Sequence, residues 1–202
     1  MSSAADVANQ PASFAFTPEN LERAKWHIAK YPPGRQASAV LALLDLAQRQ
    51  SGGWLPRAAM DHVAGILDMA PIRVYEVATF YTMFNLQPAG KYHLQVCRTT
   101  PCWLRGADDL TEACKRKLGI GLKGRTADGK FSLIEVECLG ACVNAPVVQI
   151  NDDLYEDLDV KKLEALLDAF ARGEKPEMGS QIGRQGSAPE GGPQVLLGGA
   201  GE

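Results

Sequence analysis

The sequence has no apolar run long enough to cross a membrane and no excess of positive charge. Its richest apolar stretch, residues 37–47, is interrupted by Asp45, whereas a membrane-spanning helix needs about 20 consecutive apolar residues. The 202 residues include 21 Lys and Arg against 24 Asp and Glu, a formal net charge of -3. No overall positive field is available to hold a nucleic-acid backbone. We therefore expect neither direct membrane insertion nor nucleic-acid binding.

The N-terminal segment lacks the features of an export or organelle-targeting signal. It is polar, carries Asp6 and has no Lys or Arg before Arg23, whereas a secretory signal begins with basic residues and an apolar run, and a transit peptide is rich in Arg. We expect the chain to stay in a reducing compartment or to be already processed. Five cysteines in such a chain argue against a disulfide framework and favour metal binding.

Helical periodicity dominates residues 17–86. Thr17 followed by Pro18 predicts a helix start. Apolar residues then recur at steps of three and four in successive segments that Pro and Gly separate. We expect an N-terminal four-helix bundle whose aromatic and Met side chains lie in its core, preceded by a flexible N-terminus over residues 1–16.

From residue 87 the pattern changes to strands that alternate with helices. Strands are expected at 91–97, 131–137, 147–150 and 154–156, and helices at 104–118 and 159–172. This order over residues 87–173 predicts a thioredoxin-like α/β domain, so the whole chain is of the α+β class. Residues 174–202 hold eight Gly and three Pro out of 29, which predicts a tail that is disordered alone or ordered along a partner.

Four of the five cysteines form two closely spaced pairs. Cys97 and Cys102 enclose four residues, and Cys138 and Cys142 enclose three. Each pair follows a predicted strand, so both are expected in loops at one edge of the sheet. Ionised thiolates gathered in this way repel one another unless a metal centre holds them. Cys114 shares a helical face with apolar residues, and we expect it to be a buried apolar side chain.

Three kinds of metal centre suit these cysteines to different degrees. A [2Fe-2S] cluster has two irons that each take two thiolates, so two separated pairs suit it. Structural zinc usually takes Cys-x2-Cys pairs about 15 to 20 residues apart, whereas 35 residues separate the pairs here. A [4Fe-4S] cluster usually takes a compact run of three cysteines, which the sequence lacks. The spacing favours [2Fe-2S] and leaves zinc or redox thiols open.

The residues around the second pair suit a cluster as well. Gly140, Ala141 and Ala145 would let backbone N–H groups approach inorganic sulfide. Leu139 and Val143 are expected to shield the centre from water. His27, His62 and His93 are isolated in the sequence, and we expect them to be surface or core residues and not ligands.

Two glycine-rich stretches imitate nucleotide-binding loops without their context. Residues 119–124 follow a predicted helix and not a strand, and residues 124–130 lead into a strand, where a phosphate-binding loop leads into a helix. No nucleophile with an adjacent base is apparent. We therefore expect no catalytic residues and no substrate site on this chain alone.

The sequence around the second cysteine pair carries a family resemblance. Residues 128–146, which contain Cys138-Leu-Gly-Ala-Cys142, resemble the signature of the small [2Fe-2S] subunits of the NADH-oxidising module of respiratory complex I, NADH:quinone oxidoreductase. Residues 53–56 and 76–84 are similar to helical segments of that family. The resemblance covers about residues 17–172 and fills all four ligand positions.

The resemblance implies an electron-transfer subunit whose thioredoxin-like domain holds one low-potential [2Fe-2S] cluster through Cys97, Cys102, Cys138 and Cys142. Plant-type clusters lie near ~-400 mV, and we expect Glu135 and Glu137 to help keep this potential low.

The implied partners are a subunit that binds FMN and NADH and a larger iron-sulfur subunit of the same complex. The implied location is peripheral, on the cytoplasmic side of a bacterial inner membrane, or on the matrix side for a processed mitochondrial chain. Homologous diaphorase subunits of NAD-linked hydrogenases or formate dehydrogenases stay open, as does a zinc-stabilised assembly module.

Overall fold

The chain divides after Ala89 into two units, Met1–Ala89 and Gly90–Glu202. The computed structural model describes residues 10–184 and residue 195. Among these residues, no helix is both long enough and apolar enough to span a bilayer.

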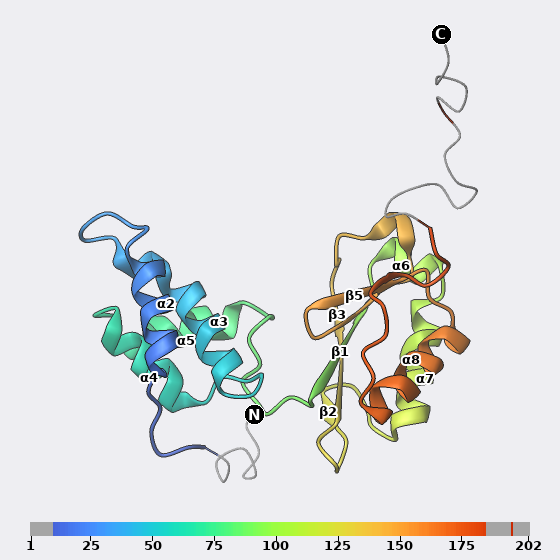
Figure 1. Ribbon diagram of the computed structural model, residues 1–202, viewed down its shortest axis with the longest axis horizontal. Coiled ribbons are helices and arrows are strands. Elements are labelled where there is room, and N and C mark those ends of the chain that lie inside the picture. The colour runs from blue at the N-terminus through green and yellow to red at the C-terminus, as the bar shows by residue number, and fades with distance from the viewer. Residues whose placement is uncertain (1–9, 185–194, 196–202) are drawn as a thin grey trace. The chain divides into compact units, whose positions relative to one another are not determined.

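Helices make up the first unit over its described residues (Figure 1). They are α2 (Pro18–Ile28), the 3-10 helix η1 (Gln36–Ala39), α3 (Val40–Gln50), α4 (Arg57–Ile66) and α5 (Pro71–Phe80). The predicted start of α2 is confirmed, because the Thr17 hydroxyl accepts a hydrogen bond from the Asn20 backbone N–H at 3.3 Å. Leu43, Leu44 and Val63 are fully buried in the shared core of these helices, where each side chain contributes about 1.5 to 3 kcal/mol of burial free energy.

The segment that precedes α2 is ordered from residue 10, so the expectation of flexibility over residues 1–16 is wrong for its second part. Phe16 is buried and Phe14 packs against the same helical core. The Gln50 side chain donates a hydrogen bond to the Ala15 carbonyl at 2.8 Å. Two apolar rings that dock on a helix core outweigh the polar composition of this short segment. Residues 1–9 lie outside the described residues.

Several aromatic and Met side chains of the first unit are exposed, although we expected them in its core. Trp26 is 61% exposed, Phe80 76% and Met83 53%. The rings of Phe80 and Tyr81 contact each other at the end of α5, with centroids 5.0 Å apart. The prediction was wrong because composition does not decide which face of a short helix meets the core.

The second unit contains one mixed sheet with the strand order β2-β3-β1-β4-β5-β6. Its strands are β1 (Tyr92–Cys97), β2 (Gly124–Arg125), β3 (Phe131–Val136), β4 (Val148–Ile150), β5 (Asp153–Glu156) and β6 (Gly179–Ser180). Strand β1 pairs with β3 in parallel and with β4 in antiparallel orientation. Since Cys97 lies opposite Val136 in this register, the chain leaves β1 and β3 at the same edge of the sheet.

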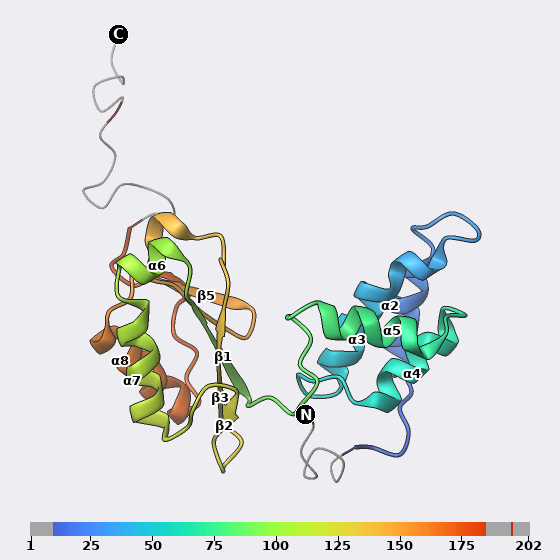
Figure 2. The same cartoon turned by 180° about the vertical axis from the view of Figure 1, so that it is seen from behind.

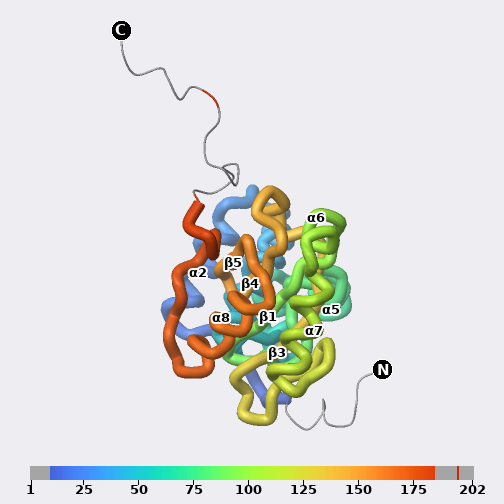
Figure 3. The backbone as a smooth tube through the Cα atoms, turned by 90° about the vertical axis from the view of Figure 1, so that its right-hand side faces the viewer, coloured from blue at the N-terminus to red at the C-terminus, as the bar shows by residue number. Residues whose placement is uncertain are grey.

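Two long helices cover one face of this sheet. Helices α7 (Ala107–Leu118) and α8 (Val160–Arg172) lie side by side in Figures 1 and 2, and Figure 3 looks at the sheet from their side. The core between sheet and helices includes Leu94, Leu133 and Leu163. The Asp159 side chain caps α8 by accepting from the Lys162 backbone N–H at 2.7 Å, as the sequence predicts.

The predicted helix over residues 104–118 is confirmed as α7, which begins three residues later than expected, and the structure adds the short helix α6 (Thr100–Leu104), which was not predicted. Gly106 separates them with φ +96°, a left-handed conformation that glycine adopts readily and that no helix interior contains. Helix α6 therefore lies at the end of β1 as a separate element and carries Cys102.

The C-terminal segment folds onto its own domain as far as residue 184, so the expected unstructured tail is wrong for residues 174–184. Strand β6 pairs in parallel with β5, with Tyr155 opposite Gly179 and Glu156 opposite Ser180. Glycine-rich composition lowers the tendency to fold but does not prevent edge pairing of this kind. Residues 185–194 and 196–202, for which a partner-bound tail was expected, lie outside the described residues.

Candidate metal centre

The four paired cysteines lie at one edge of the sheet, where β1 and β3 end. Cys97 is the last residue of β1, and Cys102 lies in α6 directly after it. Cys138 lies two residues beyond β3, and Cys142 begins the 3-10 helix η2 (Cys142–Asn144). Helices α6 and η2 are in contact. The parallel pairing of β1 with β3 therefore brings together two cysteine pairs that are 35 residues apart in the sequence.

The second pair has a geometry suited to a single metal ion. The Sγ atoms of Cys138 and Cys142 are 3.4 Å apart, and two thiolates on one tetrahedral ion stand about 3.7 Å apart when each metal–sulfur bond is ~2.3 Å. Both residues are exposed. The Gly140 backbone N–H donates to Cys138 Sγ, with 3.4 Å between the atoms.

The first pair is buried. Cys97 and Cys102 are each 1% exposed, and the Thr99 hydroxyl lies 3.3 Å from Cys97 Sγ. Burial opposes ionisation of Cys97, but hydrogen bonds from Thr99 and from the backbone of Leu139 outweigh it, so the pKa of Cys97 lies below the usual thiol value. Burial and the hydrogen bond with Cys97 raise the pKa of Cys102 to about 12.

Each pair thus combines one thiol that ionises easily with one that keeps its proton. In the exposed pair, the Gly140 N–H and the Cys142 thiol lower the pKa of Cys138, whereas the hydrogen bond to Cys138 raises the pKa of Cys142. The charge of Cys97 acts on both of these thiols. Metal ions that replaced the protons of Cys102 and Cys142 would leave four thiolates arranged as two pairs.

The thiols do not converge on a single point. Among residues 10–184 and 195, no three His, Cys, Asp or Glu side chains form a group that could surround one metal ion. One tetrahedral zinc ion needs four donors around one point, whereas the two irons of a [2Fe-2S] cluster each take two thiolates from a separate pair. Two thiol pairs at one sheet edge are the donor arrangement that a binuclear cluster uses.

Comparison with known proteins agrees with this geometry. The family model for the thioredoxin-like [2Fe-2S] ferredoxin matches residues 24–171. The chain belongs to this family. It is 64% identical over 156 residues to the E subunit of NADH-quinone oxidoreductase from Rickettsia bellii, a match that covers 77% of this chain and 93% of the relative. It is 59% identical over 166 residues to the E subunit from Rickettsia prowazekii, covering 82% of this chain and 94% of the relative.

A solved structure supports the fold of this ferredoxin family member. An NAD+-reducing [NiFe]-hydrogenase in its air-oxidized state matches with a TM-score of 0.57 and 22% identity. The match covers 64% of this chain and 23% of the hydrogenase chain. At this identity the likeness concerns the fold alone.

The surroundings of the cysteines in this ferredoxin differ from the prediction at one point. Val143 was expected to shield the centre, but its side chain is 62% exposed, because it directly follows Cys142 in an exposed loop. Leu139 packs with Cys97 and Cys102 as expected. Cys114 is fully buried, as predicted, and burial raises its pKa to about 12.

The cysteine spacing does not point to three other side chains of this region, because none of them is a metal ligand: Thr99, Asp157 and Arg184. Thr99 contacts Cys97 Sγ. Asp157 and Arg184 form a buried ion pair behind the loop of Cys142. Thr99 could have been noticed, since a hydroxyl between two candidate ligands is a common donor to sulfur, whereas no local pattern points to Asp157 or Arg184.

Proposed function

We propose that this chain is the electron-carrying E subunit of an NADH-quinone oxidoreductase and that Cys97, Cys102, Cys138 and Cys142 hold its one [2Fe-2S] cluster. The observation that carries the proposal is the arrangement of the thiols as two pairs at one sheet edge. It occurs in a chain that is 64% identical, over 93% of the relative's length, to a protein of that name.

The chain's own residues would fix and tune the centre. A [2Fe-2S] cluster, when bound, takes up and returns one electron. Cys97 and Cys102 are anchored in the packed interior by β1 and α6, whereas Cys138 and Cys142 lie in an exposed loop. Donors such as the Thr99 hydroxyl and the Gly140 N–H stabilise negative charge on sulfur. The buried pair would hold the centre, and the exposed pair would face outward.

Exposed apolar side chains next to the cysteines support a role within a larger assembly. Trp103 is 55% exposed, Leu104 70% and Val143 62%, and each is next to or within two residues of a proposed ligand. Isolated exposed apolar residues are normal, but a group around a redox centre is typical of a contact surface. We propose that this surface meets the subunit that holds FMN and NADH.

The remaining parts of the proposal concern assembly and location. A larger iron-sulfur subunit of the same complex would be the second partner, and the complex would place this chain peripherally, on the cytoplasmic side of a bacterial inner membrane or on the matrix side in mitochondria. A diaphorase subunit of an NAD-linked hydrogenase or formate dehydrogenase would use the same site, and the hydrogenase match agrees with it only at the level of the fold.

Metal and sulfide analysis of the anaerobically purified chain tests the centre. We expect about two iron and two acid-labile sulfide per chain, a visible absorption that dithionite bleaches, and a rhombic EPR signal after reduction. Zinc without sulfide would instead identify a zinc-stabilised assembly module, because zinc is colourless and redox-silent.

Co-purification from a native membrane extract tests the partner. We expect the tagged chain to bring down an FMN-containing subunit together with NADH-oxidising activity. A hydrogenase or formate dehydrogenase activity in the same fraction would assign the chain to the other class of complex, and a solitary chain would contradict the subunit role.

A further inference from the structure

A buried ion pair joins Arg184 and Asp157 in the second unit. The Arg184 side chain is 12% exposed and that of Asp157 7%. Both guanidinium contacts are short, from Nε to Oδ2 at 2.9 Å and from Nη2 to Oδ1 at 2.5 Å. The Ser180 hydroxyl donates to Asp157 Oδ2 at 2.7 Å. A two-pronged contact of this kind fixes the direction of the guanidinium as well as its charge.

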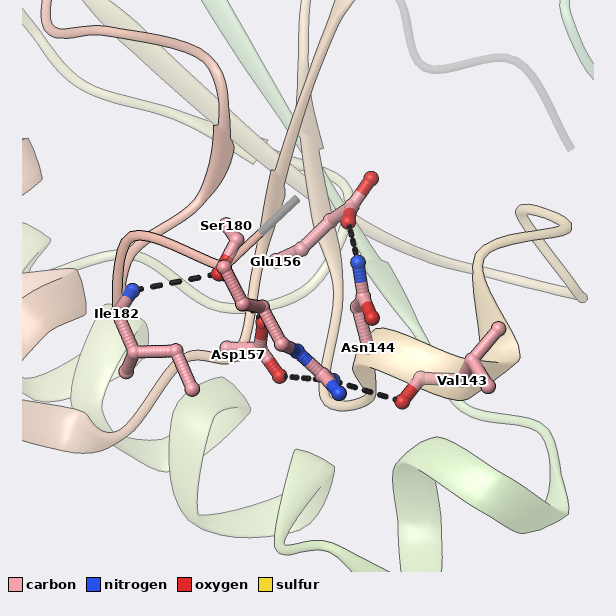
Figure 4. A network of polar contacts seen from close by, with 7 residues as sticks. Val143, Asn144, Glu156, Asp157, Ser180 and Ile182 are labelled. Atoms are coloured by element: carbon pink, nitrogen blue, oxygen red, sulfur yellow. Dashed lines mark hydrogen bonds and ion pairs between the residues drawn. The ribbon is translucent and has the colours of Figure 1, made fainter. Parts of the chain in front are cut away.

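Arg184 also holds the loop that carries Cys142. Its Nη2 donates to the Val143 carbonyl at 2.8 Å, and Val143 directly follows Cys142. The Asp157 backbone N–H donates to the carbonyl of Asn144 at 2.7 Å. Figure 4 shows Val143 and Asn144 on the loop, together with Asp157 and Ser180. Two consecutive carbonyls of this loop are therefore held by the two residues of the same ion pair.

A second contact fixes the same turn from the sheet. The Asn144 side-chain amide donates to the Glu156 carboxylate (Figure 4), and Asn144 is buried, with 3% exposure. Asp157 itself has φ +55°, a left-handed conformation that Asp and Asn adopt more readily than most side chains. The loop thus rests on β5 and on the residue that follows it.

The pairing of the C-terminal segment with the sheet places Arg184 near the loop of η2. Strand β6 pairs with β5, and the Gln181 N–H donates to the Glu156 carbonyl at 3.0 Å. We define residues 179–184 as the C-terminal clamp. Because an exposed loop without such contacts would sample many conformations, the clamp supplies order that the loop's own sequence lacks.

We propose that Arg184, together with Asp157, is a positioning residue of the metal centre: the C-terminal clamp holds the Cys142 loop in the conformation that receives a metal. The inference rests on the proposed function of the four cysteines. The clamp holds the backbone carbonyls of Val143 and Asn144. It stabilises the closed loop against opening, which would expose the metal–thiolate bonds to water and chelators.

The test compares Arg184→Gln with wild type in the full-length, cluster-loaded protein. We expect iron release to a ferrous chelator to become roughly tenfold faster, because the loop loses a charge-assisted hydrogen bond and Asp157 loses its buried partner. We also expect faster hydrogen exchange in the peptide that spans residues 138–146. Altered rhombicity of the reduced EPR signal would accompany it, a change that a purely global loss of stability does not produce.

Matched variants separate the clamp from general destabilisation. Arg172→Gln removes another C-terminal arginine that pairs with Glu174 at 2.7 Å but is 60% exposed, and we expect it to leave iron release and EPR unchanged. Arg184→Lys keeps the charge without the two-pronged contact and should give an intermediate rate. If Arg184→Gln fails to fold, Ser180→Ala tests the clamp in its place, because it removes one hydrogen-bond donor to Asp157 and should also speed iron release.

The results distinguish the inference from the proposed function. A wild-type chain without iron would overturn the metal centre and the clamp together. Wild-type iron release and EPR in both Arg184→Gln and Ser180→Ala would overturn the clamp alone. Equally faster iron release in Arg184→Gln and Arg172→Gln would also overturn the clamp, because it would show that the charge of the C-terminal segment matters and the Arg184–Asp157 ion pair does not.

Discussion

The Sγ atoms of Cys138 and Cys142 lie 3.4 Å apart in an exposed loop, with one turn of chain between the two residues. Two ionised sulfurs at this distance would repel each other. The Gly140 N–H and the Cys142 thiol lower the pKa of Cys138, and the hydrogen bond to Cys138 raises the pKa of Cys142, so one of the two keeps its proton. A pair held this way without a disulfide is poised to exchange its remaining proton for a metal ion.

Replacing Cys142 tests its place as a ligand. We expect Cys142→Ser to lose most of the iron and the reduced EPR signal, because a serine hydroxyl is a poor ligand to an iron that thiolates otherwise complete. Cys114→Ser is the control, since Cys114 is buried in the core away from the pairs, and it should keep the wild-type iron content. Full iron and an unchanged signal in Cys142→Ser would remove this residue from the ligand set.

The charge of Glu137 offers a test of how the chain sets the potential. Glu137 is exposed directly before Cys138, and a negative charge near the centre favours its oxidised state. We expect Glu137→Gln to raise the midpoint potential by an amount on the order of tens of millivolts, given Coulomb energies across partly solvated distances. Redox titration followed by EPR measures it. An unchanged midpoint would show that solvent screens Glu137 fully.

A charge-matched control belongs to the same titration. Glu164 pairs with Arg116 between α8 and α7 at 2.7 Å, outside the loops that carry the cysteines. Glu164→Gln removes the same unit of charge from the chain, and we expect no measurable change in midpoint. An equal shift in both variants would attribute the effect to net charge and not to the position of Glu137.

Local rules predict most of the elements that build the site. Thr17 and Asp159 begin helices because their side chains satisfy free backbone N–H groups within three residues. The alternation of residues 91–97 is that of a strand with one buried face, and β1 confirms it. The cysteine spacing indicates a centre with two separate pairs, because the two ligands that each iron takes lie within a few residues of each other in the sequence.

Long-range contacts explain what the sequence did not reveal. Arg184 and Asp157 are 27 residues apart, and no periodic signal links them. Strand β6 consists of two residues, Gly179 and Ser180, neither of which has a strand preference, so its pairing depends on the edge that β5 offers. Likewise, the exposure of Trp26 follows from which helix faces meet in the core and not from its own apolar character.

Close backbone packing at Gly90 gives a prediction about stability. A Cβ at this position would lie 2.4 Å from the Phe131 carbonyl carbon and 2.6 Å from the Ser132 backbone nitrogen, and the Gly90 N–H donates to the Ser132 hydroxyl at 2.9 Å. Backbone cannot move aside as a flexible side chain can. We expect Gly90→Ala to lower the free energy of unfolding of the second unit by about 1 to 3 kcal/mol.

Gly121 supplies the matched control in the same unit. A Cβ there would meet no atom within 4 Å, so Gly121→Ala should change the free energy of unfolding by less than about 0.5 kcal/mol. Urea unfolding of both variants under anaerobic conditions, followed by circular dichroism, measures the difference. Equal stability of the two variants would mean that the backbone at residues 131–132 can shift to admit a methyl group.

We expect the stability of the first unit to depend on pH through His62. Its ring lies edge-on to Phe14 and Phe16, with centroids 5.5 and 5.4 Å away, and the Phe16 backbone N–H approaches Nε2 to 3.4 Å. Burial lowers the pKa of His62 below its ordinary value of 6.5. The neutral ring can accept this hydrogen bond, whereas the protonated ring cannot, because both of its nitrogens are then donors.

The sign of the effect follows from linkage. Above the unfolded pKa of about 6.5 both states carry a neutral His62, and its full contribution to stability is present. As pH falls from there through the lower folded pKa, the unfolded chain binds a proton that the folded chain excludes, so stability declines over this window and then levels off. We expect the melting temperature of the first unit to fall as the pH is lowered from about 7.5 to 5.

The variant His62→Gln keeps an acceptor for the Phe16 N–H and should flatten the decline. NMR titration of the His62 ring decides the cause: a midpoint at or above 6.5 in the folded protein would show that burial does not disfavour its charge.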